Sequence, residues 1–152
     1  MSLYLLDTNM VSFIYNNRSP AARARLEEIA DQQLAVSAIT EGELWFGLAR
    51  NPNPRRQQAL GLFLAAFKIL PWDSQAAAVY GLVRARQERI GRKLGPQDTQ
   101  IAAHAVALGA TLVSHDTDFD SLVGATFLYT NYEKTVSRNF AIGGLEDWAT
   151  DL

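Results

Sequence analysis

Three apolar runs along the chain predict the buried strands of a sheet. Each run is short and ends where polar residues begin, which is typical of a strand that is covered on both faces. The runs are Leu3–Leu6, Leu34–Ile39 and Thr111–Ser114, with a shorter extended segment at Ile69–Pro71. The chain is therefore expected to contain a sheet whose strands are widely separated in sequence.

Between these runs, apolar residues recur at the three- and four-residue spacing of amphipathic helices. Pro20 and Pro96 can each occupy the first turn of a helix, and Gly109 is typical of a helix end. The expected helices are Met10–Ile14, Ala21–Ala30, Thr40–Leu48, Arg55–Ala66, Ser74–Ile90 and Pro96–Leu108. Alternating strands and helices favour an α/β fold with a central, mainly parallel sheet flanked by helices.

The length of 152 residues suits one domain, and no repeat, low-complexity tract or linker divides the chain. We therefore predict a single domain over residues 1–152. The segment at about 124–144 is expected to hold a β-hairpin, with strands Thr126–Thr130 and Thr135–Ile142 around Asn131–Lys134. An ordinary edge hairpin is one interpretation, and a contact surface for another molecule is the other.

Composition excludes several classes of protein. The absence of cysteine excludes thiol catalysis, cysteine–zinc sites and disulfides, and it fits a cytoplasmic protein. No apolar run approaches the ~18 residues that cross a bilayer, and the N-terminus shows no secretory signal. The net charge of −2 lacks the basic excess typical of nucleic-acid binders. Cations bound by a cluster of acids would reverse that sign locally, so net charge does not exclude a nuclease.

Four acidic residues follow strands or open helices. Asp7, Glu43 and Asp116 come after the three apolar runs in turn, and Asp98 lies in the first turn of the helix at 96–108. Because ligands of open α/β sheets bind outside the carboxyl ends of the strands, these acids can converge on one rim. Carboxylates so close together repel, and a divalent cation relieves the repulsion. Their hard oxygen atoms select Mg²⁺ or Mn²⁺, which can activate water against a phosphodiester.

Each acid also has a purely structural explanation. Asp7 can cap the following helix, and Thr40 with Glu43 has the spacing of a capping box. Asp98 suits the dipole of its helix, and Asp116 is typical of a turn. The repeated placement of acids at strand ends and helix starts, rather than any one of them, favours the metal site.

Four motifs, taken in order, resemble those of PIN-domain proteins, and most of all the VapC toxins of bacterial and archaeal toxin–antitoxin pairs. The motifs are Leu5–Asn9, Thr40–Leu44 with Gly47, Asp98–Ala103, and Leu112–Asp116 with Phe119, and Leu145–Trp148 is similar to the usual ending. The resemblance spans roughly Met1 to Phe119. It implies a PIN domain and an endoribonuclease that depends on Mg²⁺ or Mn²⁺.

Matched position by position, the resemblance implies roles for particular residues. The catalytic acids it implies are Asp7, Glu43, Asp98 and Asp116. Of these, Asp7, Asp98 and Asp116 would bind the metal, with Glu43 and Asp118 contributing, often through water. The supporting residues it implies are Thr8, Asn9 and Ser114. The implied partners are an RNA substrate, a VapB-like antitoxin, and a second copy of the chain in a homodimer or a larger toxin–antitoxin assembly.

Residues beside these motifs are candidates for contacts with partners. Five basic residues precede the Asp98 motif and either hold an RNA backbone or form a solvated helix face: Arg84, Arg86, Arg89, Arg92 and Lys93. Trp45 is the candidate for an antitoxin groove, whereas Phe46 is expected in the core. His104 and His115 fit neither a zinc motif nor a Ser-His-Asp triad.

Two alternative functions from other classes stay open. A catalytically silent PIN-like module that binds RNA or protein would carry similar motifs, although the intact set of acids argues against it. A metal-dependent phosphatase of small esters would carry a second Asp two residues after the first, where this chain has Asn9.

Overall fold

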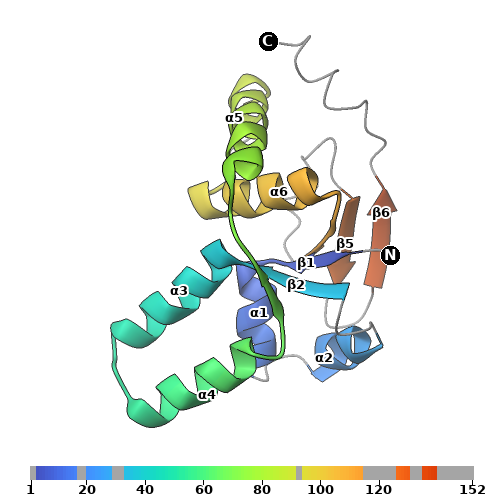
Figure 1. Ribbon diagram of the computed structural model, residues 1–152. Coiled ribbons are helices and arrows are strands. Elements are labelled where there is room, and N and C mark those ends of the chain that lie inside the picture. The colour runs from blue at the N-terminus through green and yellow to red at the C-terminus, as the bar shows by residue number, and fades with distance from the viewer. Residues whose placement is uncertain are drawn as a thin grey trace.

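The computed structural model describes residues 3–16, 20–28, 33–91 and 94–114, and two further strands at 126–130 and 135–139. Its strands form one sheet in the order β3-β2-β1-β4-β5-β6 (Figure 1). The strands are β1 (Tyr4–Leu6), β2 (Leu34–Ser37), β3 (Lys68–Leu70), β4 (Thr111–Ser114), β5 (Thr126–Thr130) and β6 (Thr135–Asn139). All neighbouring pairs are parallel except β5 with β6. The predicted α/β fold with a mainly parallel sheet is confirmed.

Helices cover both faces of this sheet (Figure 1). Those within the described ranges are α1 (Thr8–Tyr15), α2 (Pro20–Glu27), α3 (Ala38–Ala49), α4 (Pro54–Leu64), α5 (Ser74–Arg89) and α6 (Pro96–Leu108). None of them is both long and apolar enough to cross a bilayer.

The core consists of two layers because neighbouring residues of a strand point to opposite faces. Leu5 and Leu112 pack with residues of α5 and α6 such as Val83 and Ile101. Leu6, Val36 and Val113 lie on the other face, where they pack with α1, α2 and flanking residues of α3 and α4. The central strand β1 is thus buried on both sides, which explains why its sequence is a continuous apolar run.

The start of α3 differs from the prediction. The helix begins at Ala38 rather than Thr40, and β2 ends at Ser37 rather than Ile39. Ser37 is the N-cap, because its Oγ accepts a hydrogen bond from the Ile39 backbone N–H at 3.1 Å. Thr40 therefore lies inside the helix, and the capping box expected of Thr40 and Glu43 is wrong.

Helices α3 and α4 form a helical hairpin that projects beyond the sheet (Figure 1). Asn53 caps α4, with its Oδ1 accepting from the Arg56 backbone N–H at 3.1 Å. The core position expected for Phe46 is wrong, because its side chain is 55% exposed. The Arg50 guanidinium lies 5.7 Å from the centre of the Phe46 ring and covers part of it.

The two strands expected after residue 124 lie at the edge of the sheet. β5 runs parallel to β4, and β6 pairs antiparallel with β5, with Thr130 opposite Thr135. Residues 131–134 and the chain beyond Asn139 lie outside the described residues. The extent of one PIN domain over 1–152, with this hairpin as an insertion, stays a prediction.

Candidate active site

Asp7 is the first residue after β1, at the carboxyl end of a central strand. Its side chain is 1% exposed, and Oδ1 accepts a hydrogen bond from the Met10 backbone N–H at 2.6 Å. Its own backbone N–H donates to the Val113 carbonyl of β4 at 3.0 Å. Asp7 therefore does cap α1, and the positive end of that helix favours its negative charge. A capping role and a role in binding a cation are compatible, since capping fixes the carboxylate in place and lets it carry the charge that a cation needs.

Ser114 is the last residue of β4 and orients the same carboxylate. Its buried hydroxyl donates to Oδ2 of Asp7. Because the two oxygens of Asp7 accept from different elements, the plane of the carboxylate is fixed by α1 and β4 together. Neutral donors orient a carboxylate while leaving its charge in place. The ends of β1 and β4 thus hold an oriented anion at the carboxyl edge of the sheet.

Thr8 and Thr40 join the start of α1 to the start of α3. Their Oγ1 atoms lie 2.9 Å apart, and Thr40 is fully buried. Glu43 lies one turn after Thr40 and therefore on the same side of α3, the side that faces α1. Glu43 is half-buried there, whereas Asn9 is exposed in the first turn of α1.

Asp98 lies half-buried in the first turn of α6. Gly95 precedes this turn, and its carbonyl accepts from the Thr99 hydroxyl at 2.9 Å. Oδ2 of Asp98 lies 3.7 Å from the point that a Cβ on Gly95 would occupy, so the carboxylate turns back over the helix N-terminus. The positive end of α6 stabilises a negative charge in that position.

A buried pair of polar residues, which the sequence did not indicate, aligns α6 with the sheet. Nδ1 of His104 lies 2.9 Å from Oγ of Ser37, the N-cap of α3. Burial lowers the pKa of His104, while the charge of Asp73 and the carbonyl of Pro71 oppose that shift. This contact places the middle of α6 at the carboxyl end of β2. Asp98 precedes His104 in the sequence, so it lies about 9 Å closer to the N-terminus of α6, beyond the carboxyl edge of the sheet.

The structure places these acids around one edge, but it does not assemble a complete metal site from the residues it describes. In the described ranges, no three Asp, Glu or His side chains lie close enough to hold a metal ion. Asp116 and Asp118 lie outside those ranges, as does His115. The roles assigned to the acids and to Thr8, Asn9 and Ser114 therefore stay predictions.

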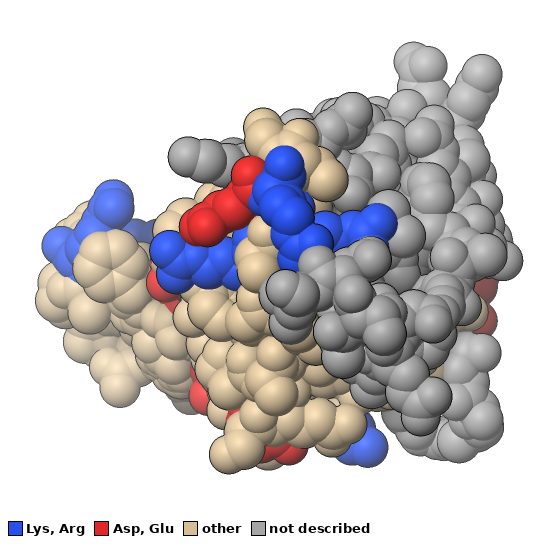
Figure 2. Space-filling model, turned by 90° about the horizontal axis from the view of Figure 1, so that it is seen from above, with Lys and Arg blue, Asp and Glu red and all other residues tan. Residues whose placement is uncertain are grey.

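Basic side chains gather over α5, as the view from above shows (Figure 2). Arg84 and Arg89 are exposed on this helix, and Arg86 is half-buried. Arg92 and Lys93 lie outside the described residues. On the other side of the fold, Trp45 is 37% exposed on α3, as an antitoxin-binding residue would need to be.

Comparison with known proteins identifies the family. Residues 4–124 match the model of the PIN domain, and the chain belongs to this family. A relative from Haemophilus influenzae named ribonuclease VapC2 is 34% identical over 117 residues, which cover 76% of this chain and 88% of the relative. The tRNA(fMet)-specific endonuclease VapC of Shigella flexneri is 32% identical over 126 residues, covering 82% and 95%. Nucleases of this family generally depend on a divalent metal.

Two solved structures of VapBC complexes have the same fold. VapBC2 from Rickettsia felis, bound to a DNA fragment from its promoter, matches with a TM-score of 0.76 and 28% identity, covering 82% of this chain and 96% of that one. DNA-bound VapBC from Salmonella typhimurium matches with a TM-score of 0.76 and 31% identity, covering 84% and 97%. The resemblance inferred from the four motifs is confirmed.

Proposed function

We propose that this chain is a metal-dependent endoribonuclease that acts as the toxin of a toxin–antitoxin pair. The observation that carries the proposal is the Asp7 carboxylate, which is buried at the end of β1 and oriented by Met10 and Ser114. Burying a carboxylate is costly unless it is well hydrogen-bonded or binds a cation. The chain belongs to a family of nucleases and has relatives named ribonuclease VapC. The chemistry that we propose for this site is therefore cleavage of RNA.

The donors at this edge fit Mg²⁺ or Mn²⁺ in chemical type. Asp7, Glu43 and Asp98 offer carboxylate oxygens, and the described side chains at this edge include no thiol that would favour zinc. We assign Asp7, Asp98 and Asp116 as metal ligands, with Glu43 and Asp118 contributing, often through water. When bound, the ion supplies Lewis-acid stabilisation of negative charge on a phosphodiester.

The other residues of the site keep these acids in position. The Ser114 hydroxyl and the Met10 backbone N–H fix the plane of the Asp7 carboxylate. The contact between Thr8 and Thr40 holds the Glu43 face of α3 against the start of α1. Such pre-positioning lowers the reorganisation that the reaction requires, which is a main source of catalytic power.

The partners we propose follow from the same relatives. The substrate is RNA, and the Salmonella and Rickettsia structures, in which VapC is found with VapB, support an antitoxin similar to VapB. We assign Trp45 on α3 to the antitoxin groove, and we propose a homodimer within a larger toxin–antitoxin assembly. The cytoplasm, where RNA and antitoxin are both present, is the proposed location.

The test is cleavage of total cellular RNA by the purified protein with Mg²⁺ or Mn²⁺ and with EDTA. The wild type should yield discrete fragments only with metal, and Asp98→Ala should yield none. Glu27→Ala is the matched control, because Glu27 is an exposed acid on α2 that pairs with Arg23 at 3.6 Å. Cleavage that survives EDTA or the Asp98 change would contradict the assignment. No cleavage by folded, antitoxin-free protein would favour a silent binding module.

A further inference from the structure

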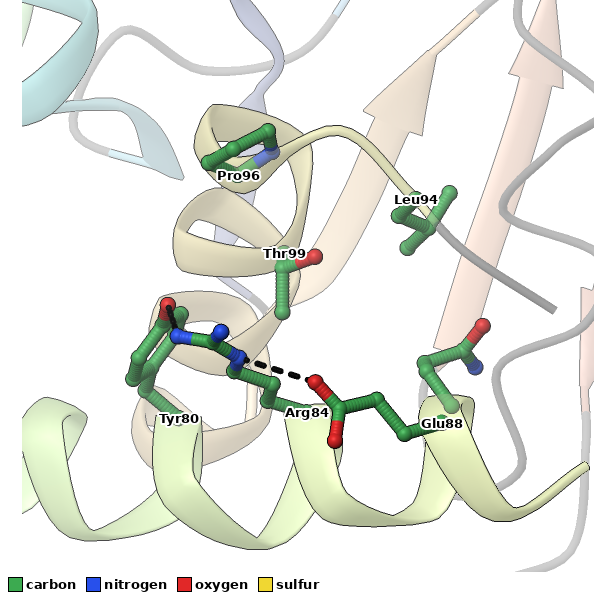
Figure 3. Close-up of a pocket in the computed structure, with 7 residues that line it drawn as sticks. Tyr80, Arg84, Glu88, Leu94, Pro96 and Thr99 are labelled. Atoms are coloured by element: carbon green, nitrogen blue, oxygen red, sulfur yellow. Dashed lines mark hydrogen bonds and ion pairs between the residues drawn. The ribbon is translucent and has the colours of Figure 1, made fainter. Parts of the chain in front are cut away.

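A pocket of about 320 Å³ lies between α5 and the start of α6 (Figure 3). Tyr80, Arg84 and Glu88 line one side, and they lie four residues apart on one face of α5. Leu94, Pro96 and Thr99 line the other side, along the loop and first turn that carry Asp98. The pocket therefore opens beside a candidate catalytic acid, although it contains none of the acids assigned to the metal.

The Arg84 guanidinium is held at the rim of this pocket. It donates to the Tyr80 hydroxyl at 3.2 Å and, through Nε, to the Glu88 carboxylate at 3.3 Å (Figure 3). These two bonds raise the pKa of Arg84 and use two of its five N–H groups. The two bonds orient the planar cation at the rim, where the Arg84 side chain is 61% exposed.

The walls of the pocket are also rigid. The Tyr80 ring packs edge-on against Trp72, with 5.9 Å between ring centres. Trp72 in turn donates from Nε1 to the Gln100 carbonyl of α6 at 3.2 Å. Tyr80 is therefore tied through Trp72 to the opposite helix, and the two sides of the pocket keep their separation.

This arrangement suits a nucleobase better than a phosphate. Glu88 already balances the charge of Arg84, which weakens attraction for an anion, but it leaves the guanidinium plane available for stacking. Unpaired RNA bases stack on aromatic rings and on Arg planes, and are read by hydrogen bonds at their edges. The volume is near the lower end of the range for small-molecule pockets, roughly 300–1,000 Å³, which is enough for one base with its sugar.

We propose that this pocket binds one unpaired base of an RNA substrate, next to the phosphodiester that the acid site cleaves. This proposal rests on the proposed function, which identifies the ligand as RNA. Leu94 and Pro96 contact the faces and edges of the base, Arg84 stacks on it, and Thr99 and Glu88 offer polar atoms to its edge. Arg84 thereby acts as a binding residue that selects single-stranded RNA near the Asp98 turn.

The test is the affinity of a short fluorescent single-stranded oligoribonucleotide, measured by anisotropy in EDTA so that no cleavage occurs. Arg84→Ala should weaken binding on the order of tenfold, as expected for one lost stacking contact. Leu94→Trp, which fills the pocket, should weaken it similarly, and Arg84→Lys should not restore it because Lys lacks the plane. Arg89→Ala is the comparison for a phosphate contact, because Arg89 is a candidate RNA-backbone contact that is exposed on the same helix and does not line the pocket.

The dependence of affinity on salt separates a base contact from a phosphate contact. Loss of a phosphate contact reduces the slope of log affinity against log salt by about 1, whereas loss of stacking leaves it unchanged. If Arg84→Ala and Arg89→Ala weaken binding equally and both reduce the slope, the pocket does not bind a base. The wild type should also prefer the single strand to a duplex of the same sequence, and Arg84→Ala should lose that preference.

The outcomes also distinguish the pocket from the nuclease. Binding that depends on Arg84, in a folded protein that cleaves no RNA, would uphold the pocket and overturn the proposed function. Metal-dependent cleavage by a protein whose affinity is unchanged by Arg84→Ala and Leu94→Trp would uphold the nuclease and overturn the pocket. Circular dichroism of each variant confirms that the protein compared is folded.

Discussion

Asp7 caps α1, and we propose that it also binds the metal; two substitutions separate these roles. Asn is as good an N-cap as Asp, so Asp7→Asn keeps the hydrogen bond from the Met10 backbone N–H. Its amide would face Ser114, whose hydroxyl can turn from donor to acceptor. Asp7→Asn thus removes the charge and keeps the contacts, whereas Asp7→Ala removes both.

The expected magnitudes follow from those contacts. Asp7→Ala loses the cap, at about 1 kcal/mol, and leaves the buried Ser114 hydroxyl without its acceptor, at about 1–3 kcal/mol. The free energy of unfolding should fall by about 2–4 kcal/mol in total. For Asp7→Asn the loss should be smaller than for Asp7→Ala, because the cap is kept and the Asn amide can donate to the Ser114 hydroxyl oxygen.

The measurements are urea unfolding and RNA cleavage for both variants. Both should cleave at least about 100-fold more slowly than the wild type, since each lacks the charge that the site requires. Cleavage by Asp7→Asn at the rate of the wild type would refute the catalytic role of the carboxylate. Equal destabilisation by Asn and Ala would refute the account of capping instead.

Two further predictions concern the contacts that support the site. Burial lowers the pKa of His104 from its ordinary value of 6.5, so the unfolded chain binds this proton more readily than the folded chain. Stability is then full above about pH 6.5 and falls as the pH drops below it, by at most about 1.4 kcal/mol per pH unit. Urea unfolding between about pH 8 and about pH 5 should show this dependence of the free energy of unfolding on pH, and His104→Asn should reduce it. If the dependence is the same in His104→Asn, groups other than His104 cause it. Replacing Thr8 and Thr40 by Val, singly and together, should give a coupling energy of about 1 kcal/mol in a double-mutant cycle, and a coupling near zero would show that their contact does not hold α1 to α3.

The sheet could be predicted from sequence because parallel strands buried on both faces appear as uninterrupted apolar runs. The same property is the reason that the predicted start of α3 is wrong. Ala38 and Ile39 continue the apolar run of β2, and periodicity alone does not separate a buried strand from the first turn of a helix. The signal that marks the boundary is chemical, since Ser37 is a favoured N-cap residue.

The positions of Asp7 after β1 and of Asp98 in the first turn of α6 were also predictable, but their neighbours were not. The contacts of Ser114 with Asp7 and of His104 with Ser37 join residues 107 and 67 positions apart. They depend on β1 lying between β2 and β4, which no local pattern specifies. Phe46 was misassigned for a related reason, because an apolar residue on α3 is buried only where the sheet lies beneath it, and α3 extends past that edge.

The distance in sequence between Asp7 and Ser114 also has a consequence for synthesis of the protein. A ribosome adds on the order of 5–20 residues per second, so on the order of 5–20 s separate the two residues during translation. Until β4 has emerged and docked beside β1, the Asp7 carboxylate lacks the hydroxyl that orients it. The nascent chain is therefore without its oriented acid until the segment that carries Ser114 has been synthesised and has folded beside β1.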